Sequence, residues 1–574
     1  MQHSPTQASG MSRTVAFVSI LLVGLVAISL RLYQINSHSF WLDEAYSWTM
    51  ATKYSFSEIL QRTANDFHPP LYFMILKCWI AVFGESEVAQ RLLSVTCDML
   101  TLQTLYLLCR DAFAETTGAD GKRESRMIGV LAAAMYAVSG IHIQWSVETR
   151  MYSMAALLSV ASSWLLLRGL ASSQRRWWIG YVISALALLY THNYGVFTVF
   201  GQTCFLIGLF ARKIVSRCNA PIANQSVTSK VGITLRVMNC DSSAEHRSFP
   251  FIPPIAAMIA ICVAFLPWLS VLLKQTKQAR TDYWIPDMNW WTIPKNWLDL
   301  IVHENLRAEQ RDSALALSVA LICLLVLGCL AWKARSRGAM LVLSMTASPI
   351  ACSAVISVIS LPIITSRHYL TACAFFFCAV AYVIVKVLPK EFLKAVAALM
   401  IVNMLYLHFA YRDELQISED CGMRAAVRHL AKDFQDGDTI VVADQAMLLS
   451  TRYYTSRLLR PSDAMHVPSP KLFRSVPLIT WLGSALIDDS DRISAAELAE
   501  RTPTRLWVIS DANDSPSGWK ELSLRNWKEQ SRDSFRGNYY FERDISVWLF
   551  LPHVSNSSGK AAETILRAGE TRAF

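Results

Sequence analysis

The sequence has little charge for its length and lacks the common signatures of soluble enzymes. Of its 574 residues only 17% are charged and 53% are hydrophobic, and the mean hydropathy is +0.30, whereas soluble domains carry about 25% charged residues. This composition excludes a soluble protein and a disordered one. There is no GxxxxGK followed by Ser or Thr, no HExxH, no GxGxxG after a strand and no GxSxG in an α/β setting. Nucleotide-driven and zinc-protease functions therefore lose support.

The cysteines form no disulfide or zinc framework. Ten of the 13 lie within or beside apolar segments, Cys218 and Cys240 lie in a central polar loop, and Cys421 alone lies in the tail. No CxxC and no Cys/His zinc spacing occurs. A disulfide within the tail is therefore excluded.

Charge divides the chain at Tyr411. Residues 1–411 hold 33 basic and 21 acidic residues, a net +12, whereas residues 412–574 hold 21 basic and 23 acidic, a net −2. The basic excess lies in short loops between apolar runs, not on a stripe or an arm, so it indicates membrane topology and no nucleic-acid partner. We expect a membrane domain over residues 1–411 and a polar domain over 412–552, followed by a disordered tail over 553–574.

About eleven apolar runs are long enough to cross ~30 Å of hydrocarbon. They span residues 14–30, 88–109, 127–143, 151–168, 177–191, 193–211, 251–273, 313–332, 339–358, 368–386 and 392–410. The first lacks a small-residue cleavage site and is predicted to be an uncleaved span, not a signal peptide. Residues 71–84 are apolar but short, which favours a helix at the membrane interface.

The loops alternate in basic content. One set holds 19 Lys and Arg, and the opposite, longer set holds about 12. The positive-inside rule places the first set in the cytoplasm. We therefore expect a multi-pass protein of the plasma (inner) membrane, with a cytoplasmic N-terminus and an extracytoplasmic C-terminal domain.

With this assignment, the unusual polar residues of the membrane region are all predicted to lie on the outward face. They are Asp43, Glu44, Asp66, His68, Glu148, Arg150, His192, Arg280 and Arg367. No comparable collection is predicted on the inside.

Two acidic motifs mark the first outer loop. Asp43 and Glu44 are adjacent and must point to different sides of a helix or strand, so one can face a cavity while the other braces the loop; a solvated loop acid is the alternative. Asp66 precedes His68 and two prolines. Asp66 is either a helix cap or, with His68 beside a free helix start, part of a phosphate site.

The later outer turns carry cations and histidine at the membrane edge. Glu148 and Arg150 either pair with each other or face a lipid headgroup or its sugar. His192 is either a satisfied core residue or a ligand-facing one. Arg280 stands in an aromatic loop that suits an interfacial belt or a sugar platform. Arg367 either snorkels or binds a lipid phosphate.

Taken together, these motifs resemble the polytopic glycosyltransferases of the protein O-mannosyltransferase type, family 39, whose bacterial relatives include the lipid A aminoarabinose transferases. The resemblance rests on the order and spacing of motifs across residues 14–410. The motifs are Trp41 to Glu44, Asp66 to Tyr72, Gly84 to Glu87, Arg91 to Ser94, Glu148 to Tyr152, Tyr190 to Tyr194, Tyr283 to Pro286 and Arg367 to Leu370.

The resemblance implies a GT-C fold, a polyprenyl-phosphate sugar donor and transfer on the extracytoplasmic face. It implies Asp43 as the general base with Glu44 beside it. It also implies donor-binding positions at Asp66, His68, Glu148, Arg150, Tyr152, His192, Tyr194, Arg280 and Arg367. The loop over residues 274–312 is too short for the inserted β-trefoil of the eukaryotic enzymes, and an α/β-like tail follows the last span, so a protein acceptor is not favoured over a lipid or a polysaccharide.

Chemistry argued from the residues agrees with this resemblance. An isoprenoid phosphate is a good leaving group, so transfer of a mannose-like hexose or an aminopentose to an acceptor hydroxyl or phosphate needs one base and cations for the phosphate. A single base predicts inversion at the anomeric carbon. A divalent metal held by Asp43, Asp66 and His68 is a further hypothesis.

The tail is predicted to be a small α/β domain. Helices are expected at 423–434 and 495–501, and strands at 438–443, 505–510 and 546–551. It has no glycine-rich phosphate loop and no acid pair, which favours docking on the membrane part or guiding an acceptor. Two other functions stay open for the whole chain: a transporter or flippase for a lipid-linked sugar, and a non-catalytic assembly subunit.

Overall fold

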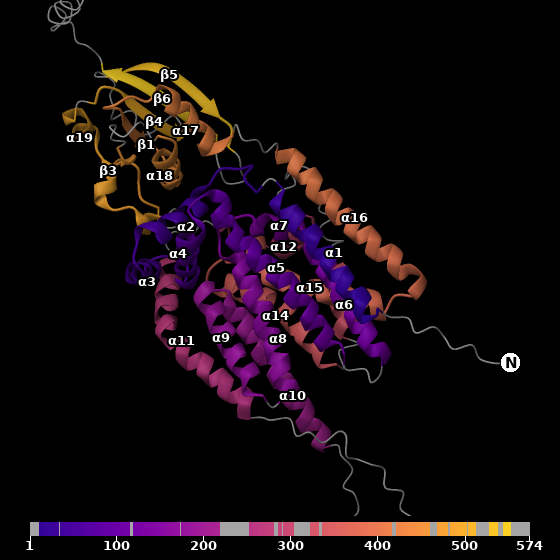
Figure 1. Cartoon of the computed structure of the whole chain (residues 1–574). Helices are drawn as coiled ribbons and strands as arrows, with labels where there is room; N and C mark the ends of the chain where they lie inside the picture. The colour runs from indigo at the N-terminus through magenta and orange to yellow at the C-terminus, as the bar shows by residue number, and fades with distance from the viewer. Residues whose placement is uncertain are drawn as a thin grey trace, which may run out of the picture.

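A computed structural model describes the chain as a helix bundle with a small sheet at one end (Figure 1). It describes residues 11–33, 35–114, 119–172, 174–218, 252–279, 285–289, 291–302, 322–331, 336–415, 421–459, 468–479, 483–501, 503–512, 527–537 and 544–552. The predicted disordered tail over 553–574 lies outside these residues.

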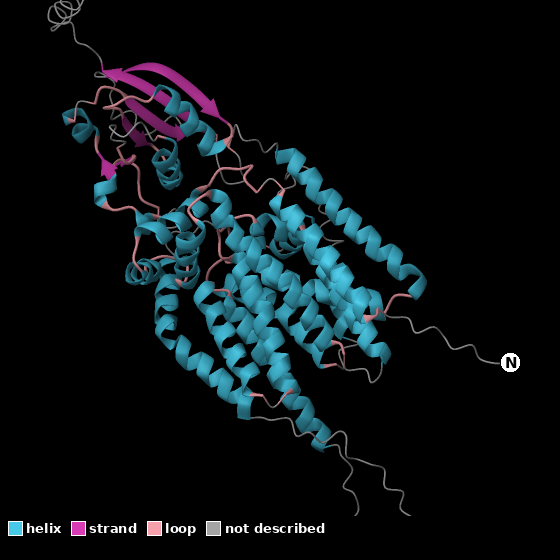
Figure 2. Cartoon of the chain, viewed as in Figure 1, coloured by secondary structure: helices cyan, strands magenta, loops and turns pink. Residues whose placement is uncertain are grey.

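Long apolar helices form the bundle, as Figure 2 shows by the predominance of helix. They are α1 (Arg13–Leu32), α5 (Glu87–Ala112), α6 (Ala119–Ala137), α7 (Gly140–Ser146), α8 (Tyr152–Ala171), α9 (Arg175–Thr191), α10 (Gly195–Cys218), α11 (Ile252–Ala279), α12 (Thr292–Val302), α14 (Arg337–Ile359), α15 (Leu370–Lys386) and α16 (Lys390–Leu415).

Within the described residues, eight helices are long and apolar enough to cross a membrane, or nine if a bent pair is one span. These eight correspond to eight of the predicted runs. The run at 127–143 is the bent pair α6 and α7, which meet at 63°. The run at 177–191 is the 17-residue helix α9, and of the run at 313–332 only the helix Ile322–Ala331 is described. The chain is therefore a multi-pass membrane protein.

Burial divides the spans into central and peripheral ones. Helix α15 is 78% buried over its apolar stretch, whereas α16 is only 11% buried, and Figure 1 shows α16 on the flank of the bundle. Exposed apolar side chains on α1, α11 and α16 suit contact with lipid. The polar residues that matter for function must therefore come from the central helices and their loops.

A buried ion pair lies at the bend between α6 and α7. The guanidinium of Arg31 lies 2.5 Å from Asp98 and also donates to the carbonyl of Ala137, the last residue of α6. Tyr136 donates to the other oxygen of Asp98 at 2.5 Å. These contacts pair two charges that would be costly alone in the hydrocarbon, and they satisfy a carbonyl near the helix break.

The loop after α1 folds into three short helices. They are α2 (Leu42–Lys53), α3 (Phe56–Ala64) and α4 (Leu71–Phe83). Helix α3 begins with a capping box of Ser55 and Glu58. Helix α4 has 13 residues, which confirms the prediction of a short apolar helix after the double proline.

The tail folds as the predicted α/β domain around a six-stranded sheet of order β3-β2-β1-β4-β6-β5. Its elements are α17 (Gly422–Asp433), β1 (Thr439–Val442), α18 (Gln445–Leu458), β2 (Lys471–Phe473), η5 (Ser484–Leu486), η6 (Asp489–Asp491), β3 (Arg492–Ile493), α19 (Ala495–Glu500), β4 (Leu506–Asp511), β5 (Trp527–Phe535) and β6 (Ile545–Pro552). Strands β3, β2, β1 and β4 run parallel to one another. Strand β6 pairs antiparallel with β4, and β5 pairs antiparallel with β6. All five predicted elements are present.

The tail domain packs directly on the loop between α1 and α5, which carries the acidic motifs. Phe40 and Trp48 of the loop belong to the same apolar core as the helices and strands of the tail. The hydroxyl of Tyr454 on α18 accepts a hydrogen bond of 2.6 Å from the Phe40 amide. Arg62 on α3 donates to the carbonyl of Ala485 at 2.6 Å. The loop that carries the acidic motifs is thus held between the bundle and the sheet.

Candidate active site

Asp43 lies between two arginines that come from distant parts of the chain. It stands in the first turn of α2. Its carboxylate is 3.5 Å from Arg150, in the turn before α8, and 3.9 Å from Arg367, in the short helix η3 (Ser366–Tyr369) before α15. The Asp43 side chain is 23% exposed. Asp43 is therefore a carboxylate that a bound molecule can reach, with fixed positive charge beside it.

Asp66 and His68 continue this cluster. Nδ1 of His68 lies 3.1 Å from Asp66, and Nε2 lies 3.1 Å from the guanidinium of Arg150. Because Arg150 can only donate, Nε2 must accept, and Nδ1 then carries the proton that Asp66 accepts. The tautomer of His68 is therefore fixed by its two neighbours.

The surroundings of Asp66 favour the ionised form of its carboxyl group. Its burial alone would raise the pKa, but hydrogen bonds to the carboxylate, first of all the one from His68, outweigh burial and hold the pKa of Asp66 below its usual value of 3.8. The alternative that Asp66 caps a helix is wrong, because α4 begins at Leu71 after Pro70 with no side-chain cap. The three groups Asp66, His68 and Arg150 form one hydrogen-bonded chain that ends at Asp43.

Glu44, next to Asp43, points the other way and is fully buried. Both of its oxygens accept from Arg91 on α5, at 2.9 and 2.8 Å. The amide of Thr149, one residue before Arg150, donates to Glu44 at 2.9 Å. Of the adjacent acids, Glu44 therefore braces the loop and Asp43 is the accessible one.

Glu148 is also fully buried. It accepts a 3.3 Å hydrogen bond from the indole of Trp41, at the start of α2. Arg150, which the sequence allowed to pair with Glu148, contacts Asp43 and His68. The turn between α7 and α8 is therefore tied to the first outer loop at both ends.

A group of aromatic rings lies beside the two arginines. The His192 ring is 5.6 Å from Tyr152 and 5.6 Å from His368, and Tyr194 stacks at 4.1 Å on His368. The guanidinium of Arg367 lies 6.0 Å from the ring of Tyr152. These contacts join the later predicted residues to the Asp43 cluster.

His192 is neutral in this setting. Burial, together with the charges of Arg150 and Arg367, lowers the pKa of His192 to about 3. Its Nδ1 accepts a 3.1 Å hydrogen bond from the backbone amide of Tyr194. An unprotonated Nδ1 leaves the hydrogen on Nε2, so the ring can donate a hydrogen bond.

Two sequence-based hypotheses concern Arg280 and a metal site. Arg280 and most of the aromatic loop around it lie outside the described residues. Among the described residues, no three His, Cys, Asp or Glu side chains are arranged to hold a metal ion. Asp43, Asp66 and His68 thus do not form the ligand set considered from the sequence, because His68 is occupied by Asp66 and Arg150.

Four contributors were not singled out from the sequence. Arg91 holds Glu44, Trp145 lies 5.7 Å under Arg367, His368 packs among the aromatic rings, and Ser47 lies 3.4 Å from Arg150. Arg91, Trp145 and His368 stand within or beside motifs that were noticed, but their partners are far apart in sequence. Ser47 gives no signal beyond its place one turn after Asp43.

Comparison with known proteins bears on the fold and on one segment of the chain. The model of the dolichyl-phosphate-mannose-protein mannosyltransferase family matches residues 67–221, a segment that includes His68, Arg150 and His192. The crystal structure of ArnT from Cupriavidus metallidurans in the apo state is similar in fold, with a TM-score of 0.54 and 11% identity over 93% of this chain and 98% of that chain. The chain is a polytopic membrane protein that shares the fold of this structure, and one segment of it matches the mannosyltransferase family model. The resemblance drawn from the sequence is thereby confirmed.

Weaker similarities involve two other GT-C structures. ArnT from the same organism bound to undecaprenyl phosphate gives a TM-score of 0.49 at 12% identity, over 92% of this chain and 97% of that chain. The Archaeoglobus fulgidus oligosaccharyltransferase complex with Zn and sulfate gives 0.45 at 12% identity, over 86% and 68%. No curated protein matches this sequence.

Proposed function

We propose that this GT-C protein is a glycosyltransferase that moves a sugar from a polyprenyl-phosphate carrier to an acceptor at the extracytoplasmic face. The observation that carries the proposal is the accessible carboxylate of Asp43 held between Arg150 and Arg367. A base and two cations in one place match what such a transfer requires. The matched family, by its name, uses dolichyl-phosphate mannose.

In the proposed reaction Asp43 takes the proton of the acceptor hydroxyl. The acceptor oxygen forms a bond to the anomeric carbon while the bond from that carbon to the phosphate oxygen breaks. The electron pair leaves with polyprenyl phosphate, which gains one negative charge. Arg150 and Arg367 stabilise that charge. One direct displacement inverts the anomeric configuration.

The other residues of the site support these groups. His68, which Asp66 orients, contacts the same guanidinium nitrogen of Arg150 that faces Asp43, and so helps to hold that nitrogen in place. We assign Glu44 a positioning role, although it was predicted among the catalytic residues, because it is fully buried and paired with Arg91. The aromatic rings around Tyr152 and Tyr194 suit the face of a sugar.

The orientation in the membrane is part of the proposal. The basic loops predict a cytoplasmic N-terminus, and the tail domain would then lie outside the plasma (inner) membrane. We expect the sugar to be a mannose-like hexose or an aminopentose and the acceptor to be a lipid, a polysaccharide or a protein. The short outer loop without an inserted domain does not favour a protein.

The test is sugar transfer by membranes that contain the wild type or Asp43→Asn. Each receives polyprenyl phosphate carrying radiolabelled mannose or, in parallel, radiolabelled aminoarabinose. The wild type should label an acceptor with one of them. Asp43→Asn should lose at least about a hundredfold in rate and still bind polyprenyl phosphate. Asp533→Asn, an exposed carboxylate on β5, is the matched control and should act like the wild type.

The same assay separates the transporter alternative. A flippase would carry the labelled donor across the membrane of sealed vesicles and leave the donor intact, whereas a transferase moves the label to an acceptor. Equal acceptor labelling by the wild type and Asp43→Asn would remove Asp43 as the base.

A further inference from the structure

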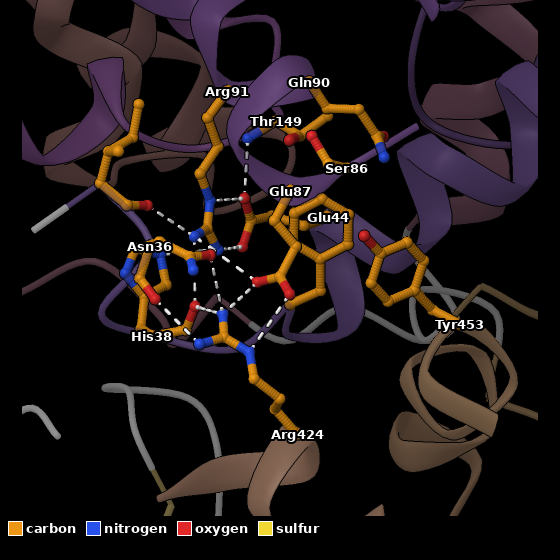
Figure 3. A network of polar contacts seen from close by, with 12 residues as sticks. Asn36, His38, Glu44, Ser86, Glu87, Gln90, Arg91, Thr149, Arg424 and Tyr453 are labelled. Atoms are coloured by element: carbon orange, nitrogen blue, oxygen red, sulfur yellow. Dashed lines mark hydrogen bonds and ion pairs between the residues drawn. The ribbon is translucent and has the colours of Figure 1, made fainter. Parts of the chain in front are cut away.

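A network of polar contacts joins the tail domain to the first outer loop (Figure 3). Its tail member is Arg424, in the first turn of α17 and only 4% exposed. Arg424 donates to the carbonyl of Asn36 at 2.8 Å and to the carbonyl of His38 at 2.8 Å. It also forms a two-point ion pair with Glu87, at the start of α5. One side chain of the tail therefore holds both the loop and the first turn of a central span.

A second arginine reaches the same place from the bundle. Arg91, one turn after Glu87 on α5, is fully buried and donates to the carbonyls of Ile35 at 2.8 Å and His38 at 3.1 Å. It lies 3.8 Å from Glu87. Figure 3 shows the two guanidiniums on opposite sides of the His38 carbonyl and the Glu87 carboxylate. The two arginines thus share one hydrogen-bond acceptor, the His38 carbonyl, and one ion-pair partner, Glu87, so displacement of one arginine changes the surroundings of the other.

The network continues from Arg91 to the candidate active site. Arg91 makes the two hydrogen bonds that hold Glu44, and Glu44 accepts the amide of Thr149. Glu44 is the neighbour of Asp43, and Thr149 is the neighbour of Arg150. A continuous series of contacts therefore leads from a helix of the tail domain to the backbone of the base and of one phosphate-facing cation.

We propose that Arg424 is a positioning residue, through which the tail domain sets the geometry of Asp43 and Arg150. This inference rests on the proposed function, because it gives the tail a role in the same reaction. The tail adds no reacting group of its own. It holds the segment at 35–38, Glu87 and hence Arg91, so that α2 presents Asp43 toward the arginines.

The same interface offers a matched control. Arg457 on α18 pairs with Glu85 at 2.8 Å, and both side chains are partly exposed. This pair also joins the tail to the membrane domain, and among the contacts of the described residues neither Arg457 nor Glu85 pairs directly with Arg91 or Glu44. Exposed pairs contribute little to stability. Removal of Arg457 therefore tests the loss of an interface charge without loss of the network.

The experiment compares Arg424→Gln, Arg424→Lys and Arg457→Gln in purified full-length protein with the wild type. We expect Arg424→Gln to lower kcat by roughly tenfold with the donor KM within about twofold, since misplacement of catalytic groups affects the transition state most. Arg424→Lys should recover part of the loss, because Lys keeps the charge but not the two-point pair. Arg457→Gln should match the wild type.

Hydrogen exchange gives a second readout that does not need activity. Amides at 35–50 and 147–151 should exchange faster in Arg424→Gln than in Arg457→Gln. Equal exchange rates in the two variants would overturn the inference. So would a fractional decrease in kcat no larger than the fractional decrease in the amount of folded protein. Should Arg424→Gln fail to fold, Glu87→Gln probes the same contact and carries the same expectations. If the wild type transfers no sugar, the proposed function fails, and the exchange comparison still decides the positioning role.

Discussion

Glu44→Gln replaces one oxygen of a fully buried carboxylate with an amide nitrogen of almost equal size. In the wild type, both oxygens face donors: Arg91 binds each of them, and Thr149 binds Oε1 as well. The amide group of Gln can serve only one of these oxygen positions as an acceptor, so its nitrogen must face a donor of Arg91. The charge of Arg91 then has only Glu87, 3.8 Å away, as a carboxylate partner among the contacts described.

The expected cost follows from this geometry. Breaking a buried ion pair by removal of one partner destabilises a protein by about 3–5 kcal/mol, and Glu87 should keep the loss near the lower end. Sugar transfer by the variant should also be slower at temperatures where it is folded, because Arg91 holds the side chain at position 44 less firmly, and that side chain positions Thr149, the neighbour of Arg150. The assay is the fraction of detergent-solubilised protein that stays folded on heating, together with sugar transfer at low temperature.

A matched control isolates the effect of burial. Glu85→Gln removes a carboxylate from the exposed pair with Arg457, and its effect on stability should stay below ~1 kcal/mol. If Glu44→Gln unfolds at the same temperature as Glu85→Gln and transfers sugar at the wild-type rate, the assignment of Glu44 as the residue that braces the site is refuted.

Two further predictions concern the cations and the histidine. Arg367→Ala should weaken the binding of polyprenyl phosphate by about tenfold or more, because an arginine–phosphate contact is charge-assisted; unchanged affinity measured with the purified protein would place the phosphate elsewhere. His192→Gln should reduce the sensitivity of stability to acid. The pKa of His192 lies near 3 in the folded state and about 6.5 when unfolded, so between these values the unfolded state binds the proton and the wild type loses stability as the pH falls. Melting temperatures of both proteins at pH 7, 6, 5 and 4.5 should converge toward low pH, and parallel curves would contradict the shift.

Local patterns predicted most of the helices and half of the tail. Apolar runs such as 88–109 and 368–386 became α5 and α15, since a segment that buries itself in lipid or among other spans must satisfy its own backbone. The strands β1, β4 and β6 were evident because central strands are apolar on both faces.

The missed elements carry a weaker local signal. Strand β5 has the sequence WKEQSRDSF and is mostly exposed, so nothing in its composition marks a strand, and its structure depends on pairing with β6. Helix α18 is buried on several sides, toward the sheet and toward α2, so it has no clear amphipathic stripe.

The candidate site shows the same division between local and distant information. The motifs named Asp43, Asp66, His68, Arg150 and Arg367 as a group on one face. The residue types alone did not distinguish Asp43 from Glu44, because both are acids after Trp41 and Leu42; only the family resemblance favoured Asp43 as the base. That difference depends on Arg91, which is 47 positions away.

The sequence by itself determined that this is a many-helix membrane protein with an α/β tail, and where its reactive residue types collect. Hydrophobic periodicity and short motifs suffice for this, because they act over a few neighbouring residues. Only the tertiary structure decided which acid is exposed, which nitrogen of His68 carries the proton, and that Arg424 holds Glu87 from 337 positions away. These facts arise from contacts between segments that meet only after the chain has folded, so no local pattern can encode them.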